Sequence, residues 1–282
     1  MTLTAREVGD LLASHGLRPS RALGQNFVAD PNTVRRIARL AEVGPGDRVV
    51  EVGPGLGSLT LALAETGATV TAVEADRHLI PVLEEVLEGT GVRVVHADAM
   101  RLDWTALLGD DPGWVMVANL PYNIATPLVA DVLDSVPAVS RMLVMVQREV
   151  GERLAAKVGD EAYGAVSVKV SYWATASIAG RVPASVFIPR PKVESVLVSI
   201  TRRPSPAVDP SSVSPDLLFD LVRAGFGQRR KMLRRALANR VPPAAFDMAR
   251  IEPEQRAEEL CVEDWGRLAA AVRAVAERDS RA

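Results

Sequence analysis

Residues 47–66 read DRVVEVGPGLGSLTLALAET, and this stretch decides the fold. It begins with a valine-rich run, continues through a loop that contains Gly53, Gly55 and Gly57, and ends in an apolar segment with helical spacing. In a strand–turn–helix unit of this kind, the glycines allow a tight turn and a close approach of the backbone to a ligand. The stretch therefore predicts the start of an α/β sheet, with a ligand site at the glycine loop.

The same alternation of strands and helices continues along the chain. Further strand-like runs lie at 68–75, 92–97, 113–120 and 141–147, and helical runs at 58–66 and 79–88. Such alternation is typical of parallel strands whose crossover helices cover both faces of the sheet. Two later runs follow each other without a helix between them, at 176–183 and 193–201. We expect this pair to add an antiparallel edge to the sheet.

Two domains are expected from the length and from one change in composition. A chain of 282 residues exceeds the usual size of one domain. Residues 202–215 hold four prolines and four serines, which is typical of a linker, and only helical patterns follow. We predict a Rossmann-like α/β domain over residues 1–203, with an N-terminal helical extension, and a small all-α domain over residues 204–282.

Composition restricts the class of protein. Hydrophobic residues make up 48% and charged residues 24% of the chain, as in ordinary globular proteins, and no apolar run approaches the roughly 20 residues that span a bilayer. The N-terminus resembles no secretory signal, so we expect a cytoplasmic protein without a membrane partner. The single cysteine, Cys261, excludes an intrachain disulfide, and the three histidines lack metal-ligand spacing. We expect no metal, and a monomer.

Three carboxylates lie at or near the ends of successive strand-like runs. Glu51 precedes the glycine loop by two residues, Glu74 lies near the end of the next run, and Asp98 follows the third. In this architecture ligands bind outside the carboxyl ends of the strands, where Glu74 can accept both hydroxyls of a ribose. Asp98 can accept from an adenine amine, cap the following turn, or do both.

Three interpretations of the glycine loop are possible: a dinucleotide site, a site for S-adenosylmethionine, and a turn that binds no ligand. A dinucleotide site has its third glycine one residue later, where this chain has Ser58, and Glu51 is unfavourable beside a pyrophosphate. The same carboxylate suits the ammonium and sulfonium of S-adenosylmethionine, and the spacing E-x-G-x-G-x-G resembles the first motif of Rossmann-like methyltransferases. A glycine turn without any ligand is the other possibility, which Glu74 and Asp98 make less favourable.

Asn119-Leu120-Pro121-Tyr122 ends the strand-like run at 113–120. The lone pair of an adenine N6 amine is delocalised into the ring, so this nitrogen needs acceptors that make it pyramidal. The side-chain oxygen of Asn119 and the carbonyl of Leu120 can each accept one N–H. Pro121 restricts Leu120 to an extended conformation, and Tyr122 offers a face for base stacking, worth about 1–3 kcal/mol. The alternative is a proline turn with Asn119 as a cap.

A basic segment follows the linker. The net charge of the chain is only −2, yet seven cations and no acid lie between Arg223 and Arg240. We expect the helical pattern at 225–240 to contact RNA phosphates, with Phe226, Met232, Leu233 and Leu237 facing the core. The predicted RNA-binding residues are Arg223, Arg229, Arg230, Lys231, Arg234 and Arg235. The alternative is a solvated helix face.

These motifs together resemble the ribosomal RNA adenine N6-dimethyltransferases, specifically the bacterial group that modifies small-subunit rRNA. The resemblance runs nearly end to end and includes GQNFV (24–28), EVGPGLGSLT (51–60), NLPYNIATPL (119–128), VFIPRPKVESVLVSI (186–200) and FGQRRKMLRRAL (226–237). Val28 and Arg235 depart from the residues that many relatives carry, which are leucine and asparagine.

The resemblance implies a site and a reaction. It implies class I S-adenosylmethionine binding by Gln25, Asn26, Val28, Glu51, Gly53, Gly55, Gly57, Glu74, Asp98, Ala99 and Asn119. It implies a catalytic loop at 119–122, with Phe187 stacked on the adenine opposite Tyr122. The implied reaction is dimethylation of two adjacent adenosines in the 3′-terminal hairpin loop of small-subunit (16S) rRNA, with a role in small-subunit biogenesis and the small ribosomal subunit as partner.

Two alternatives to this function remain. One is the large-subunit rRNA methyltransferase of the macrolide-resistance type, which shares the cofactor motifs and an N-x-P-Y loop. The other is a non-catalytic nucleic-acid-binding factor on the same scaffold. Leu120 and the matching C-terminal segments favour the small-subunit enzyme over the first. Intact Asn119, Tyr122 and Phe187 argue against the second. For Gln147 and Arg148, structural and substrate-contacting roles stay equally open.

Overall fold

The computed structural model describes residues 2–20, 23–121 and 123–280, and the chain forms two compact units. Unit 1 comprises Met1–Gly151 and Ala176–Arg202, and unit 2 comprises Glu152–Thr175 and Arg203–Ala282. The chain passes from one unit to the other after residues 151, 175 and 202. The last of these positions lies beside the boundary expected from the sequence. Unit 2 also includes residues 152–175, which no change in composition marks.

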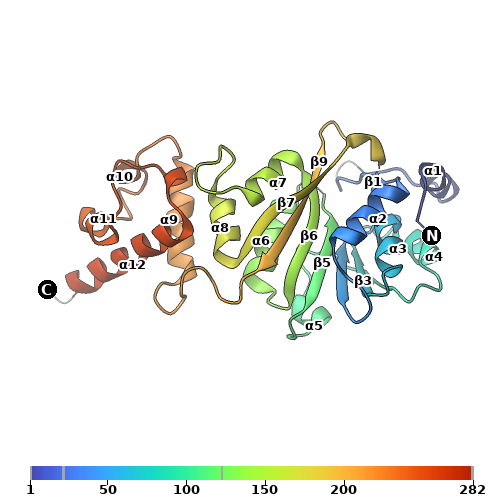
Figure 1. The fold of residues 1–282 in the computed structure, drawn as a ribbon, viewed down its shortest axis with the longest axis horizontal. Coiled ribbons are helices and arrows are strands. Elements are labelled where there is room, and N and C mark those ends of the chain that lie inside the picture. The colour runs from blue at the N-terminus through green and yellow to red at the C-terminus, as the bar shows by residue number, and fades with distance from the viewer. Residues whose placement is uncertain (1, 21–22, 122, 281–282) are drawn as a thin grey trace. The chain divides into compact units, whose positions relative to one another are not determined.

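Unit 1 is built around a seven-stranded sheet with the strand order β4-β3-β2-β5-β6-β9-β7 (Figure 1). The strands are β2 (Arg48–Val52), β3 (Thr69–Glu74), β4 (Arg93–His96), β5 (Trp114–Asn119), β6 (Val139–Gln147), β7 (Ala174–Val182) and β9 (Ser195–Arg202). The pairs among β2 to β6 are parallel, and β9 runs antiparallel to β6. The expected parallel strands and the antiparallel addition are both confirmed.

The central strands are apolar because both faces of the sheet are covered. In β5 the first five residues are all buried, and in β2 the last four are. A strand buried on both faces reads as a continuous apolar run rather than an alternating one, which is why VVEV and WVMVA predict parallel strands. Glu51 is the exception in β2, a carboxyl group inside this apolar layer.

Helices and one small ribbon complete unit 1. The helices are α1 (Ala5–Ser14), α2 (Pro31–Leu40), α3 (Ser58–Ala64), α4 (Ile80–Val86), α5 (Trp104–Leu108), α6 (Ala125–Ser135) and the start of α7 (Arg148–Ala155). Helix α2 begins with Pro31 in its first turn and with the Asp30 side chain accepting from the Thr33 N–H. The short strand β1 (Phe27–Val28) pairs antiparallel with β8 (Phe187–Ile188), which follows the 3₁₀ turn η1 (Ala184–Val186).

Unit 2 is helical. It contains α8 (Ala165–Trp173), α9 (Pro215–Gly227), α10 (Leu233–Ala236), α11 (Pro243–Ala249), the 3₁₀ turn η2 (Ala257–Glu259) and α12 (Val262–Asp279). Its core gathers around the fully buried Trp265, Tyr163 and Tyr172. A Cβ on Gly225 would lie 2.6 Å from the Trp265 ring, so α9 and α12 approach closely at that point.

The segment at 202–215, predicted as a linker, is part of the packing of unit 2. Val213 is buried, and Val208 packs so closely against α12 that a Cβ on Gly266 would lie 2.6 Å from its side chain. The proline-rich composition therefore marks an irregular backbone that is docked rather than free.

The helix predicted at 225–240 is interrupted. Helix α9 ends at Gly227, and α10 begins only at Leu233. The Leu233 N–H donates to the carbonyl of Gln255, 2.7 Å away, and the Arg234 N–H donates to that of Pro253, so these backbone groups are bonded to another segment. Leu233 and Leu237 are buried as predicted, but the prediction for Met232 was wrong, because its side chain is 41% exposed.

None of the helices within the described ranges is long and apolar enough to cross a membrane.

Candidate functional site

A cavity of about 280 Å³ opens in unit 1 beside the ends of β2, β3 and β5. Ten of the eleven residues predicted to bind the cofactor line it: Gln25, Asn26, Val28, Glu51, Gly53, Gly55, Glu74, Asp98, Ala99 and Asn119. Leu120 and Pro121 of the predicted catalytic loop line it as well. The parallel register brings these residues together because neighbouring parallel strands end at one edge of the sheet.

Gly55 and Gly57 serve different purposes in the glycine loop. Gly55 has a φ of +61°, and a Cβ there would lie 2.8 Å from the Phe27 ring. Gly57 does not line the cavity; it caps the start of α3 with a φ of +85°. A Cβ on Gly57 would lie 3.1 Å from Leu83 of α4. The structure thus gives Gly57 a role in turning and packing the chain.

Glu51 is the most unusual charged group of the cavity. Its side chain is 1% exposed, and its Oε2 has no hydrogen-bond partner among the described residues. Burial raises the pKa of Glu51 to about 8; the nearby Thr60 hydroxyl opposes this shift, and the charge of Glu74 adds to it. A buried carboxyl group without a donor is costly, so the site suits a ligand that brings a cation or a donor.

Glu74 is held by the backbone. Its Oε2 accepts from the Gly55 N–H at 3.0 Å and its Oε1 from the Asp76 N–H at 2.8 Å. Burial raises the pKa of Glu74, and these two hydrogen bonds oppose the shift. Each carboxylate oxygen keeps a further lone pair, so the group can still accept from two hydroxyls of a ligand.

Asp98 caps the turn that follows β4, which was one of its two predicted roles. Its Oδ1 accepts from the Met100 N–H at 2.9 Å, and its Oδ2 lies 3.9 Å from the Arg101 guanidinium on the exposed side. Because the residue also lines the cavity, the second role, as an acceptor for an adenine amine, stays a prediction.

The catalytic loop is anchored at both ends. The Asn119 Nδ2 donates to the carbonyl of Asn26 at 3.0 Å. The Leu120 N–H donates to the carbonyl of Met145 in β6, also at 3.0 Å, and the Pro121 carbonyl accepts from the first turn of α6. The bond to Asn26 fixes the Asn119 amide with its nitrogen engaged and its Oδ1 available as an acceptor. Tyr122 lies outside the described residues.

Phe187, the second predicted stacking residue, lies in the two-residue strand β8 of unit 1. It does not line the cavity; it is 3% exposed, pairs with Val28 across β1 and β8, and packs in the core of unit 1. The stacking role implied by the resemblance therefore has no direct support in this arrangement.

Several cavity residues were not predicted from the sequence. Leu23, Phe27, Asn123 and Ile124 line the cavity beside predicted residues in the same two segments. Asp76, which donates to Glu74 and accepts from the Gln25 side chain, was also missed. Their position next to the recognised motifs was the available signal. Within the described ranges, no group of three or more histidine, cysteine, aspartate or glutamate side chains could hold a metal ion.

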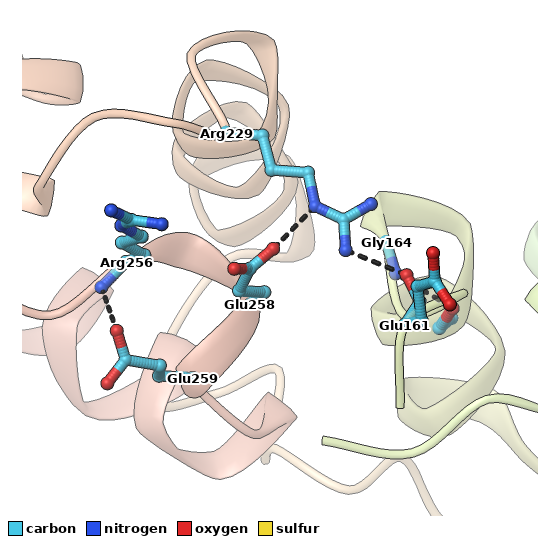
Figure 2. A network of polar contacts seen from close by, with 7 residues as sticks. Glu161, Gly164, Arg229, Arg256, Glu258 and Glu259 are labelled. Atoms are coloured by element: carbon cyan, nitrogen blue, oxygen red, sulfur yellow. Dashed lines mark hydrogen bonds and ion pairs between the residues drawn. The ribbon is translucent and has the colours of Figure 1, made fainter. Parts of the chain in front are cut away.

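The basic segment of unit 2 forms ion pairs that its sequence does not reveal. Figure 2 shows Arg229 between two other segments: its Nε donates to Glu258 of η2 at 2.5 Å, and its Nη2 donates to the carbonyl of Glu161 at 2.8 Å. Arg234 lies 3.4 Å from Glu254. Arg223 and Arg240 both pair with Asp220 of α9.

Three cations of the segment differ from these. Arg230, Lys231 and Arg235 are exposed, and their side chains have no partner in the part of the chain that the structure describes. Among the described residues, four of the seven cations are thus paired within unit 2, and these three are available to meet an external anion.

Comparison with known proteins agrees with this geometry. A family model described as ribosomal RNA adenine dimethylase matches residues 17–273. The chain belongs to the ribosomal RNA adenine dimethylase family. Its members transfer methyl groups from S-adenosylmethionine, and the site described above fits such a cofactor through the unpartnered Glu51 carboxyl and the free lone pairs of Glu74.

Curated relatives within the family are similar over nearly the whole chain. "Ribosomal RNA small subunit methyltransferase A" of Thermobifida fusca is 47% identical over 95% of both chains. The protein of the same name from Kineococcus radiotolerans is 48% identical over 95% of this chain and 91% of its own.

Two solved structures of other transferases share the fold. A dimethyladenosine transferase from Plasmodium falciparum aligns with a TM-score of 0.71 at 24% identity, covering 85% of this chain and 94% of that one. The 23S rRNA methyltransferase ErmE aligns with a TM-score of 0.67 at 26% identity, covering 88% of this chain and all of that one. The Rossmann-like methyltransferase fold predicted from the sequence is confirmed.

Proposed function

We propose that this chain dimethylates the N6 amines of two adjacent adenosines in the 3′-terminal hairpin loop of small-subunit rRNA. The observation that carries the proposal is the Asn119 amide, which lies at the edge of the cavity with its nitrogen bound to the Asn26 carbonyl. The choice of subunit is supported by relatives at 47% and 48% identity, which are named small subunit methyltransferases.

In this proposal, different cavity residues contact different parts of the cofactor. Glu51 faces the charged methionine portion, Glu74 accepts from the ribose hydroxyls, and Asp98 accepts from the adenine amine. When bound, S-adenosylmethionine supplies an electrophilic methyl group on its sulfonium. The glycine loop lets the backbone approach this ligand closely, because Gly53 and Gly55 carry no side chain.

The catalytic loop prepares the nucleophile. The Asn119 Oδ1 and the Leu120 carbonyl each accept one N–H of the target amine, which frees the lone pair of N6 from conjugation with the ring. No described residue donates to the Leu120 carbonyl, so this acceptor is available. Holding the amine in one orientation supplies much of the rate. As the N6 lone pair bonds to the methyl carbon, the S–CH3 bond breaks with its electron pair on sulfur. The cationic nitrogen that results releases one proton to water, so no strong general base is needed.

The target base must leave its RNA loop to reach these acceptors. Enzymes that modify a base extrude it into a pocket, and single-stranded loops are bound through stacking on aromatic side chains. Tyr122 is the proposed stacking residue. Phe187, which is buried in the core of unit 1, is the second stacking residue that the resemblance implies.

Unit 2 supplies phosphate contacts in this proposal. Arg230, Lys231 and Arg235 are the proposed contacts, because they are exposed and have no described side-chain partner. Arg223, Arg229 and Arg234 already pair with carboxylates of the same unit. The proposed partner is the small ribosomal subunit in the cytoplasm, and the proposed enzyme acts as a monomer.

The substrate is tested with ribosomal subunits that lack these methyl groups. Purified small and large subunits are incubated separately with labelled S-adenosylmethionine and the protein. The proposal predicts label in the small subunit only. Label in the large subunit would indicate a function like that named for ErmE, and binding without label in either would indicate a non-catalytic factor.

A further inference from the structure

One polar network connects the cofactor side of the cavity to its catalytic side. Asp76, in the loop after β3, lies at its centre. Its N–H donates to Glu74 Oε1 at 2.8 Å, its Oδ2 accepts from the Gln25 Nε2 at 2.7 Å, and its Oδ1 accepts from the His78 N–H at 3.0 Å. Asp76 itself does not line the cavity.

Both ends of the Gln25 amide are held by the protein. While its Nε2 donates to Asp76, its Oε1 accepts from the Ser20 N–H at 2.7 Å. The Gln25 backbone N–H in turn donates to the Ser20 carbonyl. The side chain therefore joins the N-terminal segment to the loop after β3, and its orientation is fixed without any ligand.

The residue after Gln25 reaches the catalytic loop. The Asn26 carbonyl accepts from Asn119 Nδ2, and the Asn26 side chain donates to the Gly24 carbonyl at 3.0 Å. A Cβ on Gly24 would lie 3.1 Å from Pro121, so the segment at 24–28 lies directly against the catalytic loop. Gln25 therefore directly precedes the residue whose carbonyl orients Asn119.

We propose that Gln25 and Asp76 are a pair of positioning residues. Their hydrogen bond fixes segment 24–28, and this keeps Glu74 and Asn119 at the positions that cofactor and target amine require. Gln25 acts through Asp76 rather than as a direct cofactor ligand. The inference rests on the proposed function, because it assigns Glu74 to the cofactor and Asn119 to the amine.

A donor–acceptor exchange tests the pair. In Gln25→Glu the new carboxylate faces the carboxylate of Asp76. In Asp76→Asn the new amide nitrogen faces the amide nitrogen of Gln25. Each single variant therefore loses the hydrogen bond between the two side chains. In the double variant the carboxylate introduced at position 25 accepts from the amide introduced at position 76 and from the Ser20 N–H. The amide oxygen at position 76 still accepts from the His78 N–H. The bond between the two side chains is therefore restored in reverse, and the net charge equals that of the wild type.

Two measurements separate the two branches of the network, the one that leads to Glu74 and the one that leads to Asn119. The dissociation constant for S-adenosylmethionine, measured calorimetrically without RNA, reports the Glu74 branch. The rate on small subunits at saturating cofactor reports the Asn119 branch. We expect each single variant to raise the dissociation constant and to lower the rate, each roughly 10- to 100-fold, as is typical for displaced supporting residues. In the double variant both values should return to within about threefold of the wild type.

Controls separate this effect from misfolding. Gln255→Glu in unit 2 makes the same chemical change where the side-chain oxygen accepts from the Glu252 N–H, and we expect no effect. If the single variants do not fold, Gln25→Met removes both side-chain hydrogen bonds without adding charge and takes their place as the test. It should weaken cofactor binding while the melting temperature shows a folded protein.

The outcomes are distinct. A wild type that does not bind S-adenosylmethionine would contradict the proposed function itself. A wild type that binds, with single variants that bind and react equally well, would overturn the positioning pair alone. A folded double variant that stays as impaired as the singles would also overturn it, because the restored bond would then not matter.

Discussion

The cavity of unit 1 and the basic segment of unit 2 handle charge in opposite ways. In the cavity, Glu51 is buried and its Oε2 has no described partner, so the free protein bears the cost of an unpaired carboxyl group. In the basic segment, four exposed or half-exposed cations are paired with carboxylates, and the other three have no partner among the described residues. An unsatisfied buried group therefore points to a ligand far more specifically than a run of surface charge does.

The largest effect is expected where the cavity meets the catalytic loop. Asn119→Ala removes the acceptor that the Asn26 carbonyl orients, and we expect the methylation rate to fall roughly 100- to 1,000-fold. The rate on small subunits is the measurement, and the exposed Asn32→Ala in α2 is the matched control. A near-wild-type rate in Asn119→Ala would show that the amide is only a turn residue.

The unpaired carboxyl of the cavity predicts a pH dependence. The pKa of Glu51 is about 8 in the fold and 4.5 when unfolded, so folding takes up a proton between these values, and stability falls as pH rises through that window. The expected loss is about 1.4 kcal/mol for each pH unit. In Glu51→Gln this loss disappears, so the variant without cofactor should be the more stable protein at pH 8 and weaker in cofactor binding.

Denaturant unfolding of the cofactor-free protein at pH 5.5 and 7.5 measures this difference. Glu88→Gln, an exposed carboxylate after α4, is the matched control and should follow the wild type. If the free energy of unfolding changes equally with pH in the wild type and in Glu51→Gln, the Glu51 carboxylate has a hydrogen-bond or ion-pair partner in solution, and the prediction is wrong.

The three cations without a described partner are expected to act on RNA affinity alone. Changing Arg230, Lys231 and Arg235 together to glutamine should reduce the salt dependence of subunit binding by about 2 to 3 in the log–log slope, with affinity roughly tenfold lower. Cofactor binding and melting temperature should not change. The control changes Arg250, Arg273 and Arg278, which carry the same charge elsewhere in unit 2; an equal effect there would show that only total charge matters.

The smallest effect is expected for a paired cation. Arg229→Gln loses the ion pair with Glu258 and the bond to the Glu161 carbonyl, and should cost about 0.5–1.5 kcal/mol of stability because the pair is half-exposed. The salt slope of RNA binding should stay near that of the wild type. A fall in this slope as large as the contribution of Arg230, Lys231 or Arg235 would contradict this expectation. It would mean that Arg229 leaves Glu258 and binds an RNA phosphate.

The sequence predicted the sheet and most of the cavity because both depend on local rules. Apolar runs of the right length predict buried parallel strands, and residues at the ends of such strands converge at one edge. Glu51, Glu74 and Asn119 therefore line one cavity although they are far apart along the chain.

The remaining features depend on contacts that no local pattern contains. The partner of Arg229 at Glu161 lies 68 residues earlier, and the carbonyls that interrupt the predicted helix belong to Pro253 and Gln255. The sequence between Arg223 and Arg240 contains no acid, but acidic residues from other segments lie next to it in the fold. Phe187 was assigned from a resemblance, and its burial beside Val28 depends on the pairing of two-residue strands.

The most direct test of the account is to locate and identify the modified nucleosides. After reaction with unmethylated small subunits, the 3′-terminal rRNA fragment is isolated, digested and analysed by mass spectrometry. We expect N6,N6-dimethyladenosine at two neighbouring positions of the hairpin loop. Monomethyladenosine only, dimethyladenosine elsewhere, or no product despite intact S-adenosylmethionine binding would contradict it.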